Sequence, residues 1–236
     1  MTKAEMQAAL AVFADPTAAE YMQKVISDTR YSMLCVRMAP LRKIAKAAAK
    51  GDWLSLTGGP FAYYEEVLCA GLAVAYAKAP LRDRLEGLRR LLPYMDSWGM
   101  TDSIVTTLRF SDAERPLLWE FALECLAGAG EYTVRFGVVL MLRFFMTEAE
   151  IPEVARRLLS LRDRRYYVQM AVAWAFAEMA VEHYEIVEKV LETGELDPFI
   201  HNKTIQKMRE SYRISAEKKE AVLRLRRKIN EKNYGN

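Results

Sequence analysis

The chain has 236 residues, of which 52% are hydrophobic and 28% are charged, a composition that suits one globular domain with a substantial core. With 11 Gly, 8 Pro and no low-complexity run, long disordered segments are not expected, and no apolar run is long enough to span a membrane. The net charge of +3 conceals a basic end, since residues 200–236 carry 11 Lys and Arg against 4 Asp and Glu. This end suggests a polyanionic partner, and a solvated charged helix is the alternative that charge alone leaves open.

Cysteine and histidine usage argues against a disulfide framework and against a metal site. Cys35, Cys69 and Cys125 are far apart and lie among apolar residues, so we expect them to be buried core residues. The two histidines lack any metal-binding spacing. We therefore expect no metal and no cofactor. The N-terminal residues form an amphipathic pattern rather than a signal peptide, which predicts a cytoplasmic protein.

Almost every segment has the apolar spacing of an amphipathic helix, bounded by Gly or Pro. The predicted helices, in chain order, are 4–14, 18–26, 38–50, 62–78, 81–92, 98–110, 115–127, 133–146, 150–161, 165–182, 183–191, 199–212 and 216–232. No stretch alternates like a half-buried strand over more than a few residues. The pattern predicts an all-α fold, a right-handed solenoid of HEAT-like helical hairpins that forms a single domain over residues 1–236. A helical bundle is the alternative.

The helix predicted at 98–110 begins with the stretch that organises the rest of the chain. Trp98 and Asp102 are four residues apart, so in a helix both side chains leave the same face. Arg135 follows Trp98 by 37 residues, and Trp174 follows Arg135 by 39, close to the roughly 40–47 residues of a HEAT repeat. Stacked repeats bring such positions side by side. We therefore expect these four side chains to line one concave surface.

Each of the four residues also has a purely structural interpretation. Trp98 and Trp174 could be core residues. Asp102 could cap a helix that begins at Ser103. Arg135 lies in an otherwise apolar helix, where a charge needs a partner, and a structural ion pair with Asp102 would provide one.

The functional interpretation uses the same four side chains for one reaction. Two indole faces can bracket a cation, a carboxylate can stabilise positive charge or orient a water, and an arginine can hold a phosphate. Together they suit cleavage of the N-glycosidic bond to a cationic base. Such a base leaves as a neutral molecule, so one carboxylate without a paired acid is sufficient.

The ordered set of motifs resembles the DNA alkylation repair enzymes of the HEAT-like-repeat type, the AlkD-like alkylpurine DNA glycosylases. The resemblance rests on Trp98-x-x-x-Asp102-Ser103-Ile104-Val105, on Arg135 in 132–135, on Trp174 in 168–174, on Tyr21-Met22 and on 202–212. It implies a curved solenoid with DNA in its concave groove, and excision of N3- and N7-alkylated purines without a metal or a lyase step. The implied partner is double-stranded DNA that contains alkylated purines, and we expect a monomer that binds no membrane.

The resemblance also assigns roles to individual residues. It implies that Asp102 is the catalytic carboxylate, that Trp98 and Trp174 contact the damaged nucleotide, and that the DNA-binding residues are Arg135, Lys203 and Lys207.

The chain departs from the family at Gly99 and Ala177, and the segment 38–40 matches it poorly. Gly99 stands where members often have a second tryptophan, and Ala177 stands where they often have a basic residue. Two other functions therefore stay open, a non-catalytic HEAT-repeat protein that binds distorted or branched DNA, and a protein-interaction scaffold.

Overall fold

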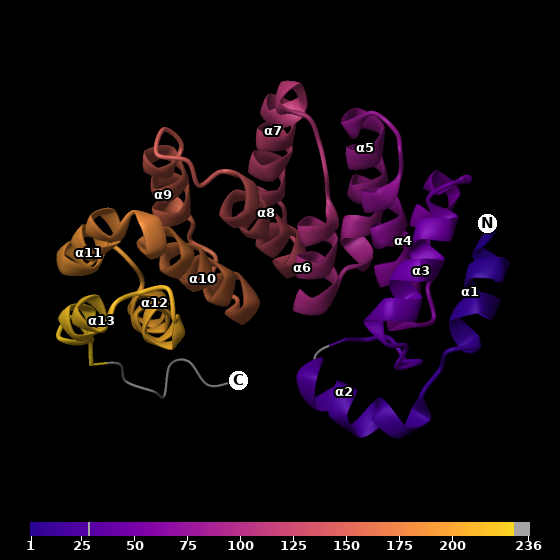
Figure 1. The fold of residues 1–236 in the computed structure, drawn as a ribbon, viewed down its shortest axis with the longest axis horizontal. Coiled ribbons are helices and arrows are strands. Elements are labelled where there is room, and N and C mark those ends of the chain that lie inside the picture. Colours follow the sequence, from indigo (N-terminus) through magenta and orange to yellow (C-terminus); the bar gives the residue numbers. More distant parts are fainter. Residues whose placement is uncertain (28, 229–236) are drawn as a thin grey trace. The chain divides into compact units, whose positions relative to one another are not determined.

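The computed structural model describes residues 1–27 and 29–228, and these residues form an all-α protein (Figure 1). Within these ranges there is no strand, and the extended pairing is limited to an isolated bridge between Ser32 and Tyr63. The predicted all-α class is therefore confirmed. None of the helices in the described ranges is long and apolar enough to cross a membrane.

The chain forms two compact units, Met1–Gly137 and the part from Val138 onward, with the boundary inside one helix. The first unit contains α1 (Lys3–Ala11), α2 (Ala19–Val25), α3 (Met38–Ala48), α4 (Tyr64–Tyr76), α5 (Leu81–Leu91), α6 (Trp98–Thr107), α7 (Arg115–Leu126) and the first part of α8 (Glu131–Phe144). Its 3-10 turns are η1 (Pro16–Ala18), η2 (Leu54–Thr57), η3 (Leu92–Tyr94) and η4 (Asp112–Glu114). The second unit contains the rest of α8, then α9 (Ile151–Ser160), α10 (Tyr166–Glu182), α11 (Tyr184–Thr193), α12 (Pro198–Glu210) and α13 (Ala216–Leu223).

Local sequence signals place the helix ends. Thr2 and Glu5 form a capping box at the start of α1. Pro40 lies in the first turn of α3, where its missing N–H is not needed. At the end of α11, Gly194 adopts a φ of 71°, a left-handed conformation that glycine enters without strain. Each predicted helix is present, most with ends that differ by a few residues.

The largest difference from prediction concerns the last helix, predicted over 216–232. α13 ends at Leu223, and residues 229–232 of that prediction lie outside the described residues. The helix ends early because the following carbonyls have other partners. The His201 ring bonds the carbonyl of Leu225, and the Asn202 amide donates to the carbonyl of Arg227, so the chain leaves the helical path.

In each unit one buried helix is covered by its neighbours. α4 packs against α3, α5 and α6, and α10 packs against α9, α11 and α12. Gly71 permits the close approach of α4 to α6, since a Cβ there would lie 2.2 Å from Cδ1 of Ile104. All three cysteines are buried and free, as predicted. The solenoid arrangement and the single domain over the whole chain stay predictions.

Candidate functional site

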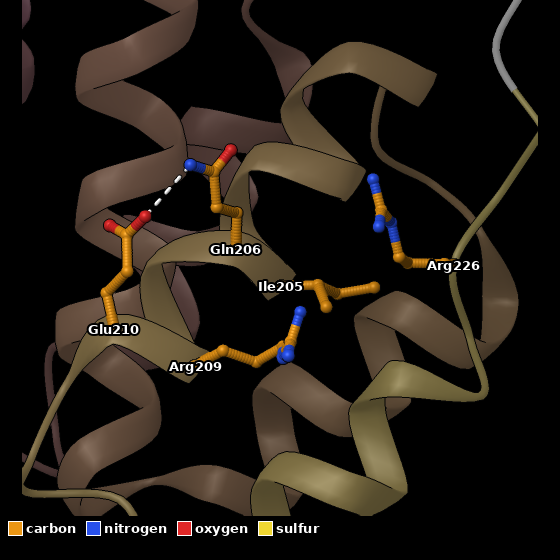
Figure 2. Close-up of a pocket in the computed structure, with 5 residues that line it drawn as sticks. All are labelled: Ile205, Gln206, Arg209, Glu210 and Arg226. Carbon is orange, nitrogen blue, oxygen red and sulfur yellow. Dashed lines mark hydrogen bonds between the residues drawn. The ribbon is translucent and has the colours of Figure 1, made fainter.

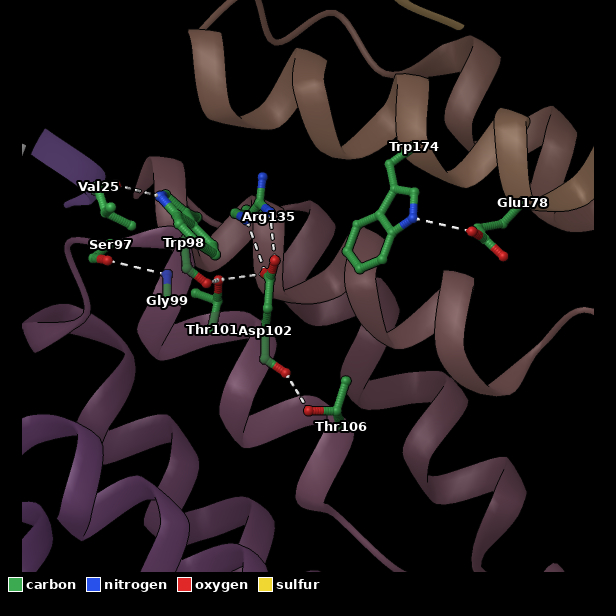
Figure 3. Close-up of polar contacts among 10 residues, drawn as sticks. All are labelled: Val25, Ser97, Trp98, Gly99, Thr101, Asp102, Thr106, Arg135, Trp174 and Glu178. Atoms are coloured by element: carbon green, nitrogen blue, oxygen red, sulfur yellow. Dashed lines mark hydrogen bonds and ion pairs between the residues drawn. The ribbon is translucent and has the colours of Figure 1, made fainter. Parts of the chain in front are cut away.

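The centre of the candidate site is an ion pair between α6 and α8 (Figure 3). The Arg135 guanidinium donates from Nε to Asp102 Oδ1 at 3.0 Å and from Nη2 to Asp102 Oδ2 at 2.7 Å. The side chain of Arg135 is 7% exposed and that of Asp102 is 17% exposed. A two-point pair of this kind fixes the orientation of the carboxylate as well as its charge.

The two oxygens of Asp102 have unequal environments. Oδ1 accepts from Arg135 Nε and lies 2.9 Å from the hydroxyl of Thr101, whose single proton is shared with the carbonyl of Trp98 at 3.0 Å. Oδ2 accepts only from Arg135 Nη2 among the described residues. One lone pair of Oδ2 therefore remains for a water or for a positive charge that approaches from solvent.

Helix α6 presents Trp98 and Asp102 one turn apart, as the four-residue spacing predicts. Ser97 caps this helix, since its hydroxyl accepts from the backbone N–H of Gly99 at 3.0 Å. The interpretation of Asp102 as a helix cap is therefore wrong, because Asp102 lies inside the helix that Ser97 begins. The indole Nε1 of Trp98 donates to the carbonyl of Val25 at 3.2 Å, which ties the half-buried ring to the end of α2.

Tyr64 explains why Gly99 occupies its position in α6. A Cβ on Gly99 would lie 2.5 Å from the Tyr64 hydroxyl, so a larger side chain would displace this tyrosine. Tyr64 is 4% exposed, and its burial raises the pKa of its hydroxyl to about 12. The space next to Trp98 is thus filled from α4, and the departure from the family at Gly99 has a packing cause.

In the second unit, Trp174 is part of a polar chain of its own (Figure 3). Its Nε1 donates to Glu178 Oε1 at 3.3 Å, and Arg213 from beyond α12 donates to the other oxygen of Glu178. Trp174 is half-buried, whereas Ala177 is buried and offers no room for an exposed basic side chain. Because Trp174 belongs to the second unit, its place beside Asp102 stays a prediction.

The predicted DNA-binding lysines lie on α12. Lys203 Nζ donates to Gln206 Oε1 at 3.1 Å, and its ammonium lies 5.7 Å from the ring centre of Phe199. Lys207 is half-buried. The roles predicted for Lys203, Lys207 and Arg135 in binding DNA stay predictions.

Three residues that shape these groups were not predicted from the sequence, namely Tyr64, Thr101 and Glu178. The spacing of Trp174 and Glu178 is a signal that could have been read, since residues four apart on a helix are neighbours. Thr101 precedes Asp102 directly, but its contact depends on the rotamer. Tyr64 gave no signal, because only the packing of α4 on α6 brings it to Gly99.

Residues 1–27 and 29–228 contain no group of three or more His, Cys, Asp or Glu side chains that could hold a metal ion. Comparison with curated proteins and with solved structures gave no match. The family model described as DNA alkylation repair enzyme matches residues 6–218, a range that includes the Asp102–Arg135 pair, Trp174 and α12. The chain therefore belongs to the DNA alkylation repair enzyme family, as the resemblance of its motifs predicts.

Proposed function

We propose that this member of the family is a DNA glycosylase that hydrolyses the N-glycosidic bond of cationic N3- and N7-alkylated purines in DNA. The observation that carries the proposal is the Asp102 carboxylate. It is oriented by Arg135 and Thr101, keeps one lone pair of Oδ2 available, and lies one helical turn from Trp98. The family match supports the coarser statement, a role in the repair of alkylated DNA.

The chemistry requires a single carboxylate. When the bond between C1′ and the purine nitrogen breaks, its electron pair moves to the base and neutralises the positive charge that alkylation created. The deoxyribose becomes oxocarbenium-like, and the anion of Asp102 stabilises this charge as it develops. A water then adds its oxygen to C1′ and gives up a proton, which completes the hydrolysis without a general acid for the leaving group.

Arg135 acts in this proposal mainly as a positioning residue. Its side chain is more buried than that of Asp102, and two of its nitrogens donate to the carboxylate. It therefore fixes the orientation of the Asp102 carboxylate, which is the more exposed of the two side chains. Arg135 would contact the DNA backbone only from that fixed position.

The second unit completes the site in the proposal. A right-handed solenoid of HEAT-like hairpins, one domain over the chain, would bring Trp174 to the face that carries Trp98 and Asp102. Glu178 and Arg213 would then hold the indole in place. Lys203 and Lys207 would bind phosphates of double-stranded DNA. The proposed enzyme is a cytoplasmic monomer that uses no metal or cofactor.

One observation favours a second candidate function, a non-catalytic protein that binds distorted or branched DNA. The Asp102–Arg135 pair joins α6 to α8, and a pair with this geometry can serve stability alone. In that case the basic residues bind DNA and no bond is broken.

Release of 7-methylguanine from methylated DNA separates the two candidates. We expect the wild type to release the base, and Asp102→Asn to lower the single-turnover rate by roughly 100-fold or more while DNA affinity is kept. Asp112→Asn is the matched control, since Asp112 is exposed on η4 and the chemical change is the same.

Two results would count against the proposal. DNA binding without base release by the wild type would favour the non-catalytic protein. A wild-type rate in Asp102→Asn would reduce Asp102 to an ion-pair partner. Because Asp102→Asn removes the negative charge of a buried ion pair, the double variant Asp102→Asn/Arg135→Gln is measured as well, and circular dichroism verifies folding.

A further inference from the structure

The second unit contains a cavity of about 440 Å³ beside α12, which we name the α12 pocket (Figure 2). It is lined by Ile205, Gln206, Arg209, Glu210 and Arg226. Four of these residues project from one helix, and Arg226 comes from the segment that follows α13. The pocket therefore has two walls that are far apart in sequence.

The two arginines of the α12 pocket differ from most others in the unit. Within the described part of the chain, the side chains of Arg209 and Arg226 have no hydrogen-bond or ion-pair partner, and both residues are exposed. Arg157, Arg165 and Arg213, by contrast, are each paired with a carboxylate. Two unpaired guanidinium groups at one cavity create a local positive potential that suits an anion.

The carboxylate in the pocket has a different partner. Glu210 Oε1 accepts from the Gln206 amide at 2.8 Å, and Gln206 Oε1 in turn accepts from Lys203 Nζ. The lining residues therefore carry two positive charges and one negative charge, and the negative charge is held along α12 and not against either arginine. Lys203 adds another positive charge on the same helix.

The wall that carries Arg226 is fixed on both sides. The carbonyl of Leu225 is bonded by the buried His201 ring at 2.8 Å. The Asn202 side chain makes two hydrogen bonds to the backbone of Arg227. Its Nδ2 donates to the carbonyl at 2.8 Å, and its Oδ1 accepts from the N–H at 2.9 Å. The backbone of Arg226 is thus held between two anchored residues, so its side chain starts from a fixed point beside the pocket.

We propose that the α12 pocket binds a phosphodiester group of the DNA backbone, with Arg209 and Arg226 donating to the same phosphate from opposite walls. The guanidinium fork matches the geometry of phosphate oxygens. A cavity of this volume is larger than a phosphate ion needs and suits a nucleotide unit. The inference rests on the proposed function in that DNA is taken as the ligand, but it concerns binding and not base release.

The test measures affinity for undamaged duplex DNA over a range of salt concentrations. Arg209→Gln and Arg226→Gln should each lower affinity by about three- to ten-fold at low salt. Because the remaining arginine still neutralises the shared phosphate, each single variant should change the log–log salt slope by less than about 0.9, and the double variant should make it shallower by about 0.9. The matched control is Arg224→Gln, since Arg224 is exposed in the same unit, carries the same charge and does not line the pocket. It should change affinity by about two-fold or less.

The double variant tests whether both side chains bind the same phosphate. Two donors on one group are coupled, so Arg209→Gln/Arg226→Gln should lose less affinity than the two single losses combined. If both single variants behave like Arg224→Gln, the pocket contributes only general charge and the proposal is overturned.

A second arm separates DNA from a free anion. Inorganic phosphate is added to the wild type, and the guanidinium signals of Arg209 and Arg226 are followed by NMR. Tight binding of inorganic phosphate, with DNA affinity unchanged in both variants, would show that the ligand is a free anion and would overturn the proposal.

Failure of this proposal is distinguishable from failure of the glycosylase proposal. If the variants lose DNA affinity but the wild type releases no alkylpurine, the pocket stands and the enzymatic activity does not. If base release is normal and the variants bind DNA like the control, the pocket is wrong and the glycosylase stands.

Discussion

In the first unit the Arg135 guanidinium is buried against Asp102, whereas in the second unit Arg209 and Arg226 face an open pocket without a partner in the described part of the chain. The loss of hydration at Arg135 is offset by bonds to a carboxylate of the same chain. Arg209 and Arg226 keep their hydration until a ligand replaces it.

This difference separates two uses of arginine in one protein that acts on DNA. A paired, buried guanidinium cannot exchange its partner for a phosphate without leaving a carboxylate unpaired, so it orients that carboxylate. An unpaired, exposed guanidinium can exchange water for phosphate at little cost, so it contributes affinity.

The largest expected effect is on stability, from loss of Arg135. Arg135→Met should lower the free energy of unfolding by about 3 kcal/mol, because Asp102 would be left largely desolvated without its counter-charge. Arg226→Met, the matched change at an exposed and unpaired arginine, should stay within about 0.5 kcal/mol of wild type. Urea denaturation monitored by circular dichroism measures both. The double variant Arg135→Met/Asp102→Leu should recover much of the lost stability. Equal losses in Arg135→Met and Arg226→Met would contradict the distinction between a paired, buried arginine and an unpaired, exposed one.

The next effect concerns Trp174. If its indole faces the substrate, Trp174→Ala should lower both DNA affinity and the excision rate by about ten-fold, since an aromatic face serves the ground state and the transition state alike. Trp174→Phe keeps an aromatic face and loses only the bond to Glu178, so it should retain most of both. Equal losses in the two variants, measured in single-turnover assays, would show that the bond to Glu178 matters and the ring face does not.

A smaller effect is expected at Gly99. Gly99→Ala should lower the free energy of unfolding by about 1 kcal/mol, because overpacking against Tyr64 costs about 1–3 kcal/mol and the gain in helix propensity offsets about 1 kcal/mol. Tyr64→Phe removes the hydroxyl that a new Cβ would meet. In that background the same Gly99→Ala change should be neutral or stabilising in urea denaturation. A destabilisation of the same size in both backgrounds would argue against the packing explanation.

The helices were predictable from sequence because apolar residues recur at helical spacing and Gly or Pro lies between them. The end of the last helix was not. Its periodicity runs on past Leu223, but His201 and Asn202 bond the backbone at Leu225 and Arg227. These bonds join residues more than twenty positions apart, and no local pattern encodes them.

The candidate site was predictable to a similar extent. From the sequence, an ion pair between Asp102 and Arg135 was one of the interpretations left open, and the structure contains this pair. The alternative in which Asp102 caps a helix is wrong, because the helix begins at Trp98 and Ser97 caps it. The α12 pocket could not be predicted, since Arg226 falls within the stretch predicted as helix and reaches Arg209 only through the tertiary bonds of His201 and Asn202.

The smallest expected effect is a pH dependence of the free energy of unfolding, which arises at His201 beside the segment that carries Arg226. His201 Nε2 must donate to the carbonyl of Leu225, which leaves the buried Nδ1 without a partner in the described part of the chain. A second proton would place an N–H there with no acceptor, and Arg227 nearby adds repulsion. Burial, more than this repulsion, therefore lowers the pKa of His201 below its ordinary value of 6.5.

The sign of the pH effect follows from proton binding. Below about pH 6.5 the unfolded chain protonates His201 and the folded chain does not, so the free energy of unfolding falls as pH decreases toward the folded pKa. Above pH 6.5 the contribution of His201 is fully present. His201→Gln can still donate to the carbonyl of Leu225 and does not titrate, so urea denaturation between pH 5 and 7.5 should show a weaker pH dependence than in the wild type. His183→Gln is the control and should keep the wild-type dependence, because it leaves His201 intact. If His201→Gln and the wild type lose stability equally on acidification, His201 is not the group that titrates.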